Sequence, residues 1–337
     1  MIFDSINENL NLIDAKSSTT INWPWAQGTL VPVLLIGVGL ITLLTLPRHQ
    51  AVGQGITYYT YFLLVILALY LLLWLLNLAG LPLGANIRER TPLLSAVLTI
   101  LVIWQLITLN WDLLPLPYFP SPAKILEALV GDSKLLLIST GYSLRLLAVG
   151  YFVGAGLGLI TGTAMGWYSQ FRYWINPLVR IIGPIPSSAW IPLAMVIFPN
   201  SFSASVYLIS LATWFPVTVM TWSGISNINQ SFFEAARTLG ADEKYLITRV
   251  AIPGALPMVF IGLFMGLGVS FVTLIVAEML GVKAGLGWYI QWAQGWGEYY
   301  KVYAGLIIMA AICSFLMSLL FIIRDHLLVW QRGLIKW

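Results

Sequence analysis

The chain has 337 residues, of which 59% are hydrophobic and only 9% are charged, and its formal net charge is +4. Soluble globular domains carry about 25% charged and about 45–50% apolar residues, so this composition excludes that class and indicates a membrane protein. The small positive charge gives no reason to expect nucleic-acid binding.

Eight apolar segments are long enough to cross a hydrocarbon core of about 30 Å, which takes roughly 20 helical residues. They lie at 28–47, 57–79, 92–112, 137–166, 177–198, 203–225, 257–280 and 303–327. The sequence therefore predicts an all-α polytopic membrane protein with about eight transmembrane helices. The first segment follows an acidic leader and has no small-residue cleavage site after it, so we expect a retained span rather than a signal peptide.

The distribution of lysine and arginine predicts the orientation of these spans. With the N-terminus inside, ten such residues lie in inner segments: Lys16, Arg88, Arg90, Arg172, Arg237, Lys244, Arg249, Arg324, Arg332 and Lys336. Five lie in outer segments: Arg48, Lys124, Lys134, Lys283 and Lys301. Because cytoplasmic segments carry the excess of these residues in membrane proteins, we expect both termini in the cytoplasm.

The spans fall into two groups of different composition. Residues 1–85 contribute two spans rich in Leu and Tyr, which is typical of accessory helices that face lipid. Residues 86–337 contribute six spans that contain prolines, glycines, hydroxyls and charges. Such residues are expected where helices pack closely or line a cavity, so we expect the function in this second domain.

The fourth span carries a row of glycines at a spacing of four: Gly150, Gly154, Gly158, Gly162 and Gly166. This spacing places all five on one helical face, which another helix can approach closely. The face is either a static packing surface or a sliding contact between moving helices. Gly262 and Gly266 of the seventh span are the expected partner surface.

Five prolines interrupt the fifth span: Pro177, Pro184, Pro186, Pro192 and Pro199. An interior proline removes a backbone donor and frees a carbonyl, so we expect this span to be broken or kinked. In lipid such a break is tolerated only where protein or water satisfies the freed groups. Ser187, Ser188 and Trp190 lie at the break and are therefore candidates for lining a translocation pathway.

One compact charged element lies between the sixth and seventh spans, on the predicted cytoplasmic side. Ser231 and Glu234 have the spacing of a capping box, which predicts a helix start at residue 231. Gly240 is suited to end this helix in the left-handed conformation, and Asp242 can start a second helix that runs to Pro253. A helix pair this small cannot bury its own apolar side chains, so we expect it to press into a partner.

The motifs of enzymes are missing from the sequence. His49 and His326 both lie at span ends, so the chain has no HExxH or other histidine metal pair. It has no GxxxxGK[ST] phosphate loop, and no serine has a histidine base at a comparable depth. Cys313 is the single cysteine, which excludes a cysteine metal cluster. We therefore expect this chain to have no catalytic residues and no metal site.

The charged element resembles the EAA motif of binding-protein-dependent ABC importer permeases. In this sequence the motif is Glu234-Ala235-Ala236, then Gly240, then Val250-x-Ile252-Pro253. Within that group the chain is most similar to the nitrate, sulfonate, taurine and bicarbonate permeases, on the segments FPSPAKILEAL, PIPSSAWIPL and AEML...GLGWYIQWA. The resemblance covers roughly residues 90–335.

This resemblance implies a type I ABC importer transmembrane domain whose coupling loop, residues 226–257, contacts an ATPase. The residues that match the coupling element are Glu234, Ala235, Ala236, Arg237, Leu239, Gly240 and Asp242. It also implies a homodimer of permeases, two ATPase subunits that bind ATP and Mg²⁺, and a periplasmic or lipid-anchored binding protein, in the inner membrane of a bacterium. This chain would bind no cofactor itself, and Glu234 either caps its own helix or contacts a basic residue of the ATPase.

The resemblance implies import of a small oxyanion of the nitrate, bicarbonate, sulfonate or taurine type by alternating access. The alternatives are import of a pyrimidine precursor or an aromatic acid, and an ATP-independent secondary transporter. The chain departs from many relatives at Gly183, where they carry a basic residue just before the PIP sequence.

Three charged residues inside the spans are further candidates for the pathway. Arg145 and Glu278 lie near the outer ends of spans four and seven, where they either pair at an outer gate or extend separately to the interface. Arg180, near the inner end of span five, either attracts an anion or reaches the lipid head groups.

Overall fold

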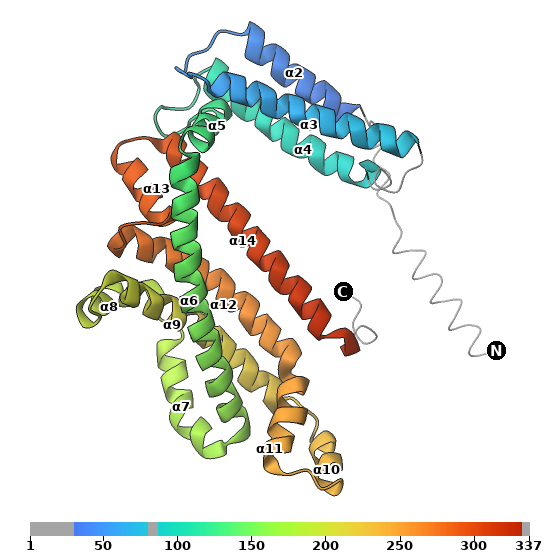
Figure 1. Ribbon diagram of the computed structural model, residues 1–337, viewed down its shortest axis with the longest axis vertical. Helices are drawn as coiled ribbons and strands as arrows, with labels where there is room; N and C mark the ends of the chain where they lie inside the picture. The colour runs from blue at the N-terminus through green and yellow to red at the C-terminus, as the bar shows by residue number, and fades with distance from the viewer. Residues whose placement is uncertain (1–29, 80–86, 332–337) are drawn as a thin grey trace, which may run out of the picture. The chain divides into compact units, whose positions relative to one another are not determined.

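The computed structural model describes residues 30–79 and 87–331, which belong to two compact units, Met1–Ala128 and Leu129–Trp337. All regular structure in these described residues is helical (Figure 1). The predicted all-α fold is therefore confirmed. The acidic leader and the predicted domain boundary between residues 85 and 86 lie outside the described residues, so the division into domains 1–85 and 86–337 stays a prediction.

The first unit is built on three long helices and one short one. These are α2 (Val31–Thr45), α3 (Gly55–Leu78), α4 (Ile87–Gln105), which a π-helical turn (Leu106–Asn110) extends, and α5 (Pro122–Gly131), whose last three residues belong to the second unit. Their buried core is formed by Ile36, Leu43, Tyr59, Leu63, Leu98, Leu109 and Ala123. Gln105 fixes α4 to α2, because its amide donates to the carbonyl oxygen of Gly39 at 3.1 Å.

The described helices give six or seven membrane spans. Six are long and apolar enough to cross a membrane, and a seventh results if the bent pair α7 and α8 counts as one span. The remaining predicted span, 28–47, is the shorter α2, whose 15 residues cover about 22 Å at 1.5 Å per residue. This helix ends at Thr45 because Leu46 precedes Pro47 and is extended.

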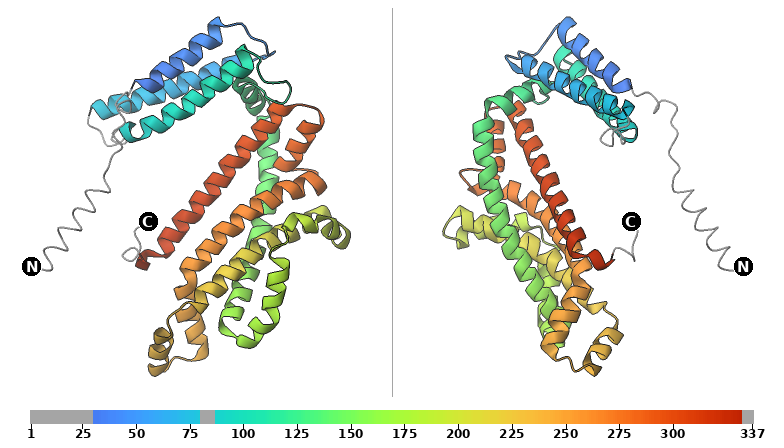
Figure 2. Two further views of the ribbon diagram at one scale, coloured as in Figure 1. Left: turned by 180° about the vertical axis from the view of Figure 1, so that it is seen from behind. Right: turned by 45° about the vertical axis from the view of Figure 1, so that its right-hand side comes forward.

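The second unit contains the elements of the candidate site. They are α6 (Ser133–Trp167), α7 (Ser169–Ile182), a 3-10 turn (Ser187–Trp190), α8 (Ile191–Ile197), α9 (Ser201–Ser226), α10 (Gln230–Thr238), α11 (Glu243–Tyr245), a π turn (Leu246–Ala251), α12 (Ile252–Gly281), α13 (Leu286–Gly295) and α14 (Tyr299–Leu327). The α10–α11 hairpin lies at one end of this unit and α13 at the other (Figures 1 and 2). The long helices α6 and α12 connect the two ends.

The glycine row of α6 faces α9 along its length. A Cβ atom built on Gly158 would lie 2.7 Å from Cβ of Val217, and one built on Gly162 would lie 2.6 Å from the carbonyl oxygen of Thr218. Such distances are shorter than any real Cβ contact, so the two helices reach this separation only because α6 carries glycine there.

The prediction that Gly262 and Gly266 pack against this row is wrong. Gly262 and Gly266 of α12 do not meet the glycines of α6, because they also face α9, at Pro216 and Thr213. The helix α9 therefore packs against both α6 and α12, and each of them approaches it through glycines.

The fifth predicted span is broken, as its prolines predict. The helices α7 and α8 are bent by 90° to one another at the break. There the hydroxyl of Ser187 forms a 2.6 Å hydrogen bond with that of Thr273 on α12. The backbone of Gly183 lies against the ring of Phe215, so a basic side chain at this position would overlap the ring.

Candidate functional site

The start of α10 differs from the predicted capping box. The N-cap is Asn229, whose Oδ1 accepts a hydrogen bond from the backbone N–H of Ser231 at 3.0 Å. The hydroxyl of Ser231 donates to the same oxygen, so it does not cap the helix. The predicted box of Ser231 and Glu234 is therefore wrong, because asparagine is as good a cap as serine and here it comes first. The side chain of Glu234 is exposed and makes no hydrogen bond to the described residues.

The end of α10 and the start of α11 form as predicted. Gly240 is left-handed, with a φ of +85°. Its N–H donates to the carbonyl of Arg237 at 2.9 Å, and the N–H of Ala241 donates to that of Ala236 at 3.1 Å. These two bonds define a Schellman motif, which closes a helix by a left-handed residue. Asp242 then caps α11, with its carboxylate 2.7 Å from a backbone N–H.

The second helix of the hairpin was predicted to end at Pro253, and this prediction is wrong. It continues through the π turn into α12, so that Glu243–Met279 is one run of 37 residues. Pro253 lies in the first turn of α12. We attribute the continuity to the π turn, because its wider spacing accommodates the missing N–H and the ring of the proline.

One face of the hairpin is fixed to its own chain. Phe233 and Leu246 are 8% and 1% exposed and pack in a core with Ile225 of α9. The ring of Trp167, at the end of α6, meets that of Phe233 edge-on at a centroid distance of 5.6 Å. The indole N–H of Trp167 also donates to Glu243 at 3.1 Å.

The other face of the hairpin is apolar and exposed. Phe232, Leu239 and Tyr245 are 64%, 89% and 52% exposed. Phe232, Ala235 and Leu239 are spaced by three and four residues, so they lie on one side of α10, and all three are exposed. A cluster of large apolar side chains on an otherwise charged element is typical of an interaction surface.

The candidates at the break between α7 and α8 lie in different surroundings. Ser187 is buried, while Ser188 and Trp190 are half-buried. The indole N–H of Trp190 is enclosed and has no hydrogen-bond partner among the described residues. Arg180 is exposed in the last turn of α7.

Glu278 is buried at the α13 end of the unit, with 1% of its surface exposed. Its Oε1 accepts from the hydroxyl of Ser143 at 2.7 Å, and its Oε2 accepts from the N–H of Gly287 at 2.8 Å. The hydroxyl oxygen of Ser143 accepts in turn from the N–H of Leu286 at 2.8 Å. Side chains of α6 and α12 thus together satisfy the first N–H groups of α13, which have no partner within their own helix.

The structure does not bring Arg145 to Glu278. Arg145 is exposed, and its guanidinium lies over the ring of Phe202 at 5.3 Å from the centroid. Two residues along a helix point about 200° apart, so when Ser143 faces Glu278, Arg145 faces away.

A second polar cluster fixes α13 from its other side. The hydroxyl of Tyr289 donates to Asp132, which precedes α6, at 2.8 Å. Lys301 of α14 bridges Asp132 and Glu298 at 3.4 and 2.9 Å. Burial, together with the hydrogen bond to Asp132, raises the pKa of the Tyr289 hydroxyl, so it remains a donor at every physiological pH.

Known proteins are similar in sequence to this chain over most of the second unit. The family described as "Binding-protein-dependent transport system inner membrane component" matches residues 136–329. The putative aliphatic sulfonates transport permease protein SsuC of Bacillus subtilis is 31% identical over 247 residues, which cover 72% of this chain and 87% of the relative. The taurine transport system permease protein TauC of Escherichia coli is 29% identical over 260 residues, which cover 74% and 90%.

A solved structure supports the fold. A chain of the MetNI methionine ABC transporter, in inward-facing conformations, superposes with a TM-score of 0.51 at 19% identity, covering 58% of this chain and 98% of that one. The fold is thus that of a type I ABC importer transmembrane domain, and the chain belongs to the family of binding-protein-dependent transport system inner membrane components, as a permease subunit of an ABC importer.

Proposed function

We propose that an ATPase subunit drives this permease through the α10–α11 hairpin. The observation that supports this most is the exposed face of Phe232, Leu239 and Tyr245, on an element whose opposite face is packed into its own chain. ATP and Mg²⁺ would bind to the separate ATPase, since the sequence of this chain has no phosphate loop. A displacement of the hairpin would pass directly into α12, because α11, the π turn and α12 form one helical run.

The complete importer in this proposal has two copies of the permease, two ATPase subunits and an external binding protein. A pathway between the two copies would be lined at the α7–α8 break by Ser187, Ser188 and Trp190, with Arg180 nearer the cytoplasm. In the alternating-access cycle, closure of the ATPase dimer turns the cavity outward to receive the solute. Opening after hydrolysis turns it inward.

The proposed solute is a small oxyanion of the sulfonate type. The names of the relatives SsuC and TauC refer to aliphatic sulfonates and to taurine, and nitrate and bicarbonate belong to the same class of small anions. Uptake of each anion by proteoliposomes that contain the permease, its ATPase and its binding protein tests this choice. If the proteoliposomes take up an aromatic acid or a pyrimidine precursor and none of these anions, the proposed oxyanion is wrong.

Replacing Gly240 by valine is expected to uncouple ATP hydrolysis from transport. A branched side chain at a φ of +85° costs about 1–2 kcal/mol, so the hairpin would change its angle rather than keep the left-handed turn. No atom lies within 4 Å of the position of a new Cβ, so packing within the chain stays intact. We expect uptake per ATP hydrolysed to fall at least about tenfold, while the protein still inserts into the membrane.

Gly297 provides a matched control for this strain. It is also left-handed, with a φ of +71° and no atom within 4 Å of a new Cβ, but it precedes α14 at the other end of the unit. Gly297→Val should therefore retain the ratio of uptake to hydrolysis. Unchanged coupling in Gly240→Val would contradict the proposed role of the hairpin.

Replacing Leu239 by aspartate is expected to weaken binding of the ATPase without unfolding the permease. The side chain is 89% exposed, so its loss removes no internal packing, while a charge in an apolar contact has to be desolvated. We expect at least about tenfold weaker association, which is about 1.4 kcal/mol. Pull-down of the ATPase measures this, with Trp296→Asp as the control, because Trp296 is 73% exposed at the other end of the unit. Equal retention of the ATPase by both variants would argue against the exposed face as the docking surface.

A further inference from the structure

A cavity of about 380 Å³ lies between the hairpin and the ends of α6, α7 and α9. Its wall includes Gln230, Phe233 and Arg237, which are spaced by three and four residues and so share the inner side of α10. Trp167, at the end of α6, and Arg172, in the first turn of α7, belong to the same wall. The exposed apolar face of the hairpin takes no part in it, so the cavity is a separate site.

The charges in the wall favour an anion. Arg172 is half-buried, and its guanidinium makes no hydrogen bond or ion pair with the described residues. Arg237 contacts Glu243 only at 3.5 Å, and both side chains are more than half exposed, so this pair is weak in water. These three charges, two positive and one negative, leave the wall with a net charge of +1.

The size and position of the cavity favour a ligand with an organic body. Its volume lies within the range of small-molecule sites, about 300–1,000 Å³, and a bare inorganic anion would leave most of it unfilled. Tyr168, Tyr173 and Trp174, which follow the wall residues Trp167 and Arg172 in sequence, are 55%, 72% and 73% exposed. Exposed aromatic residues cluster at the membrane–water interface, where both lipid head groups and soluble solutes reach the protein.

We infer that this cavity binds the phosphate group of an organic phosphate, with Arg172 as its principal contact. A guanidinium group binds phosphate oxygens through two parallel hydrogen bonds, and Trp167 and Phe233 offer apolar surface to the rest of the ligand. The phosphate belongs either to the head group of an anionic phospholipid or to a soluble metabolite. A ligand here touches both α7 and α10, so it restrains movement of the hairpin relative to the membrane spans. The effect of this restraint on transport rests on the proposed function of the hairpin, whereas binding of the ligand does not.

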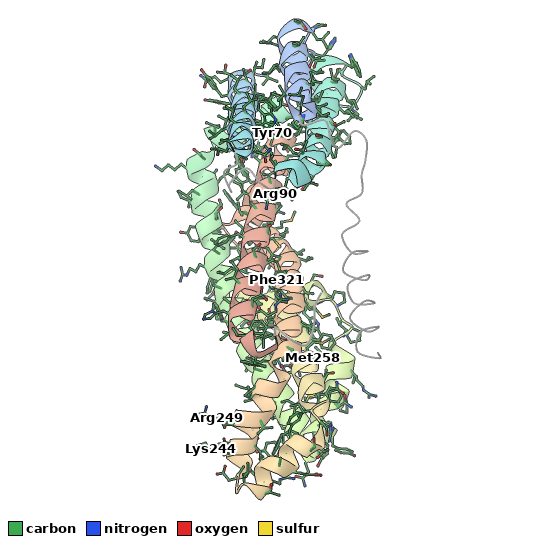
Figure 3. The ribbon with its side chains drawn as sticks, turned by 90° about the vertical axis from the view of Figure 1, so that its right-hand side faces the viewer. Tyr70, Arg90, Lys244, Arg249, Met258 and Phe321 are labelled. Carbon is green, nitrogen blue, oxygen red and sulfur yellow. The ribbon has the colours of Figure 1, made fainter. Side chains whose placement is uncertain are left out.

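Titration of the full-length permease with glycerol 3-phosphate tests the soluble source. Arg172→Gln should weaken binding at least about tenfold, or about 1.4 kcal/mol, with an unchanged melting temperature in the absence of ligand. The matched control is Arg249→Gln, because Arg249 is exposed on the π turn next to the hairpin and outside the cavity wall (Figure 3). That variant should bind within about twofold of the original chain.

Nanodiscs of phosphatidylcholine, with or without phosphatidylglycerol, test the lipid source. If a lipid is the ligand, phosphatidylglycerol should raise the melting temperature of the original chain and of Arg249→Gln but not that of Arg172→Gln. If Arg172→Gln alone loses binding of glycerol 3-phosphate, or alone loses stabilisation by phosphatidylglycerol, the site is supported and the source of the phosphate is identified. Equal effects of the two substitutions would show diffuse surface charge, and no effect of either phosphate would show an empty cavity; both results overturn the inference. The ATPase rate of the assembled importer, measured with and without the bound phosphate, separately tests the restraint of the hairpin.

Discussion

Replacement of Glu278 by alanine is expected to destabilise the permease by about 2–5 kcal/mol and to lower uptake at least about tenfold. The substitution leaves the buried N–H of Gly287 and the hydroxyl of Ser143 without their acceptor, and each such group costs about 1–3 kcal/mol. The removed side chain also leaves a cavity. With its N-terminus no longer held, α13 would lose its fixed position on α6 and α12.

Two variants make this expectation specific. Glu278→Gln keeps the shape and can still accept from Gly287, so its melting temperature should lie between those of the original chain and Glu278→Ala. Asp325→Ala removes a carboxylate from an exposed pair with Arg324, which contributes about 0–1 kcal/mol, and should leave both melting temperature and uptake unchanged. An alanine variant at 278 as stable as the original chain would contradict the proposed capping of α13.

Replacement of Gly162 by alanine is expected to cost about 1–3 kcal/mol, although alanine is the better helix former. The new Cβ would lie 2.6 Å from the carbonyl oxygen of Thr218 and from Cβ of Thr221, so α6 and α9 would have to separate. Backbone cannot move aside as a flexible side chain can. We expect a lower midpoint of thermal unfolding and less folded protein in the membrane.

Gly156 of the same helix should respond with the opposite sign. It has no atom within 4 Å of a new Cβ, so alanine there adds only helix propensity, worth about 0.5–1 kcal/mol. The comparison therefore separates the effect of close packing from that of losing a glycine. A stability gain in both variants would show that α6 and α9 are less tightly packed than the structure indicates.

Local signals in the sequence predicted the local structure of the hairpin and of the broken span. Gly240 and Asp242 act on their own neighbours, through a positive φ and a side-chain cap, and both act as predicted. The prolines of the fifth span likewise predicted its break, because a missing donor affects only the preceding turn. The start of α10 was misplaced since Asn229 and Ser231 are equivalent caps from sequence alone.

The contacts between helices could not be predicted in the same way. Depth in the membrane, counted along each span, placed Arg145 and Glu278 together, but only the rotation of α6 decides that Ser143 faces the carboxylate. A sequence signal was present in Gly285 and Gly287, which leave no room for a side chain beside Glu278. The glycines of α6 and α12 predicted close neighbours correctly, but not that α9 is the neighbour of both.

The helix that begins in the hairpin ends beside α13. At 1.5 Å per residue, the 37 residues of Glu243–Met279 extend about 55 Å, and Glu278 is the last but one of them. The π turn is the one part of this length that is not α-helical among the described residues, and Pro257 lies inside α12 beyond it. Because a helix resists shortening along its axis, the proposed displacement of the hairpin would reach Glu278 almost unreduced. A more flexible π turn should therefore delay the movement of α13 at Glu278 and leave the movement of the hairpin unchanged.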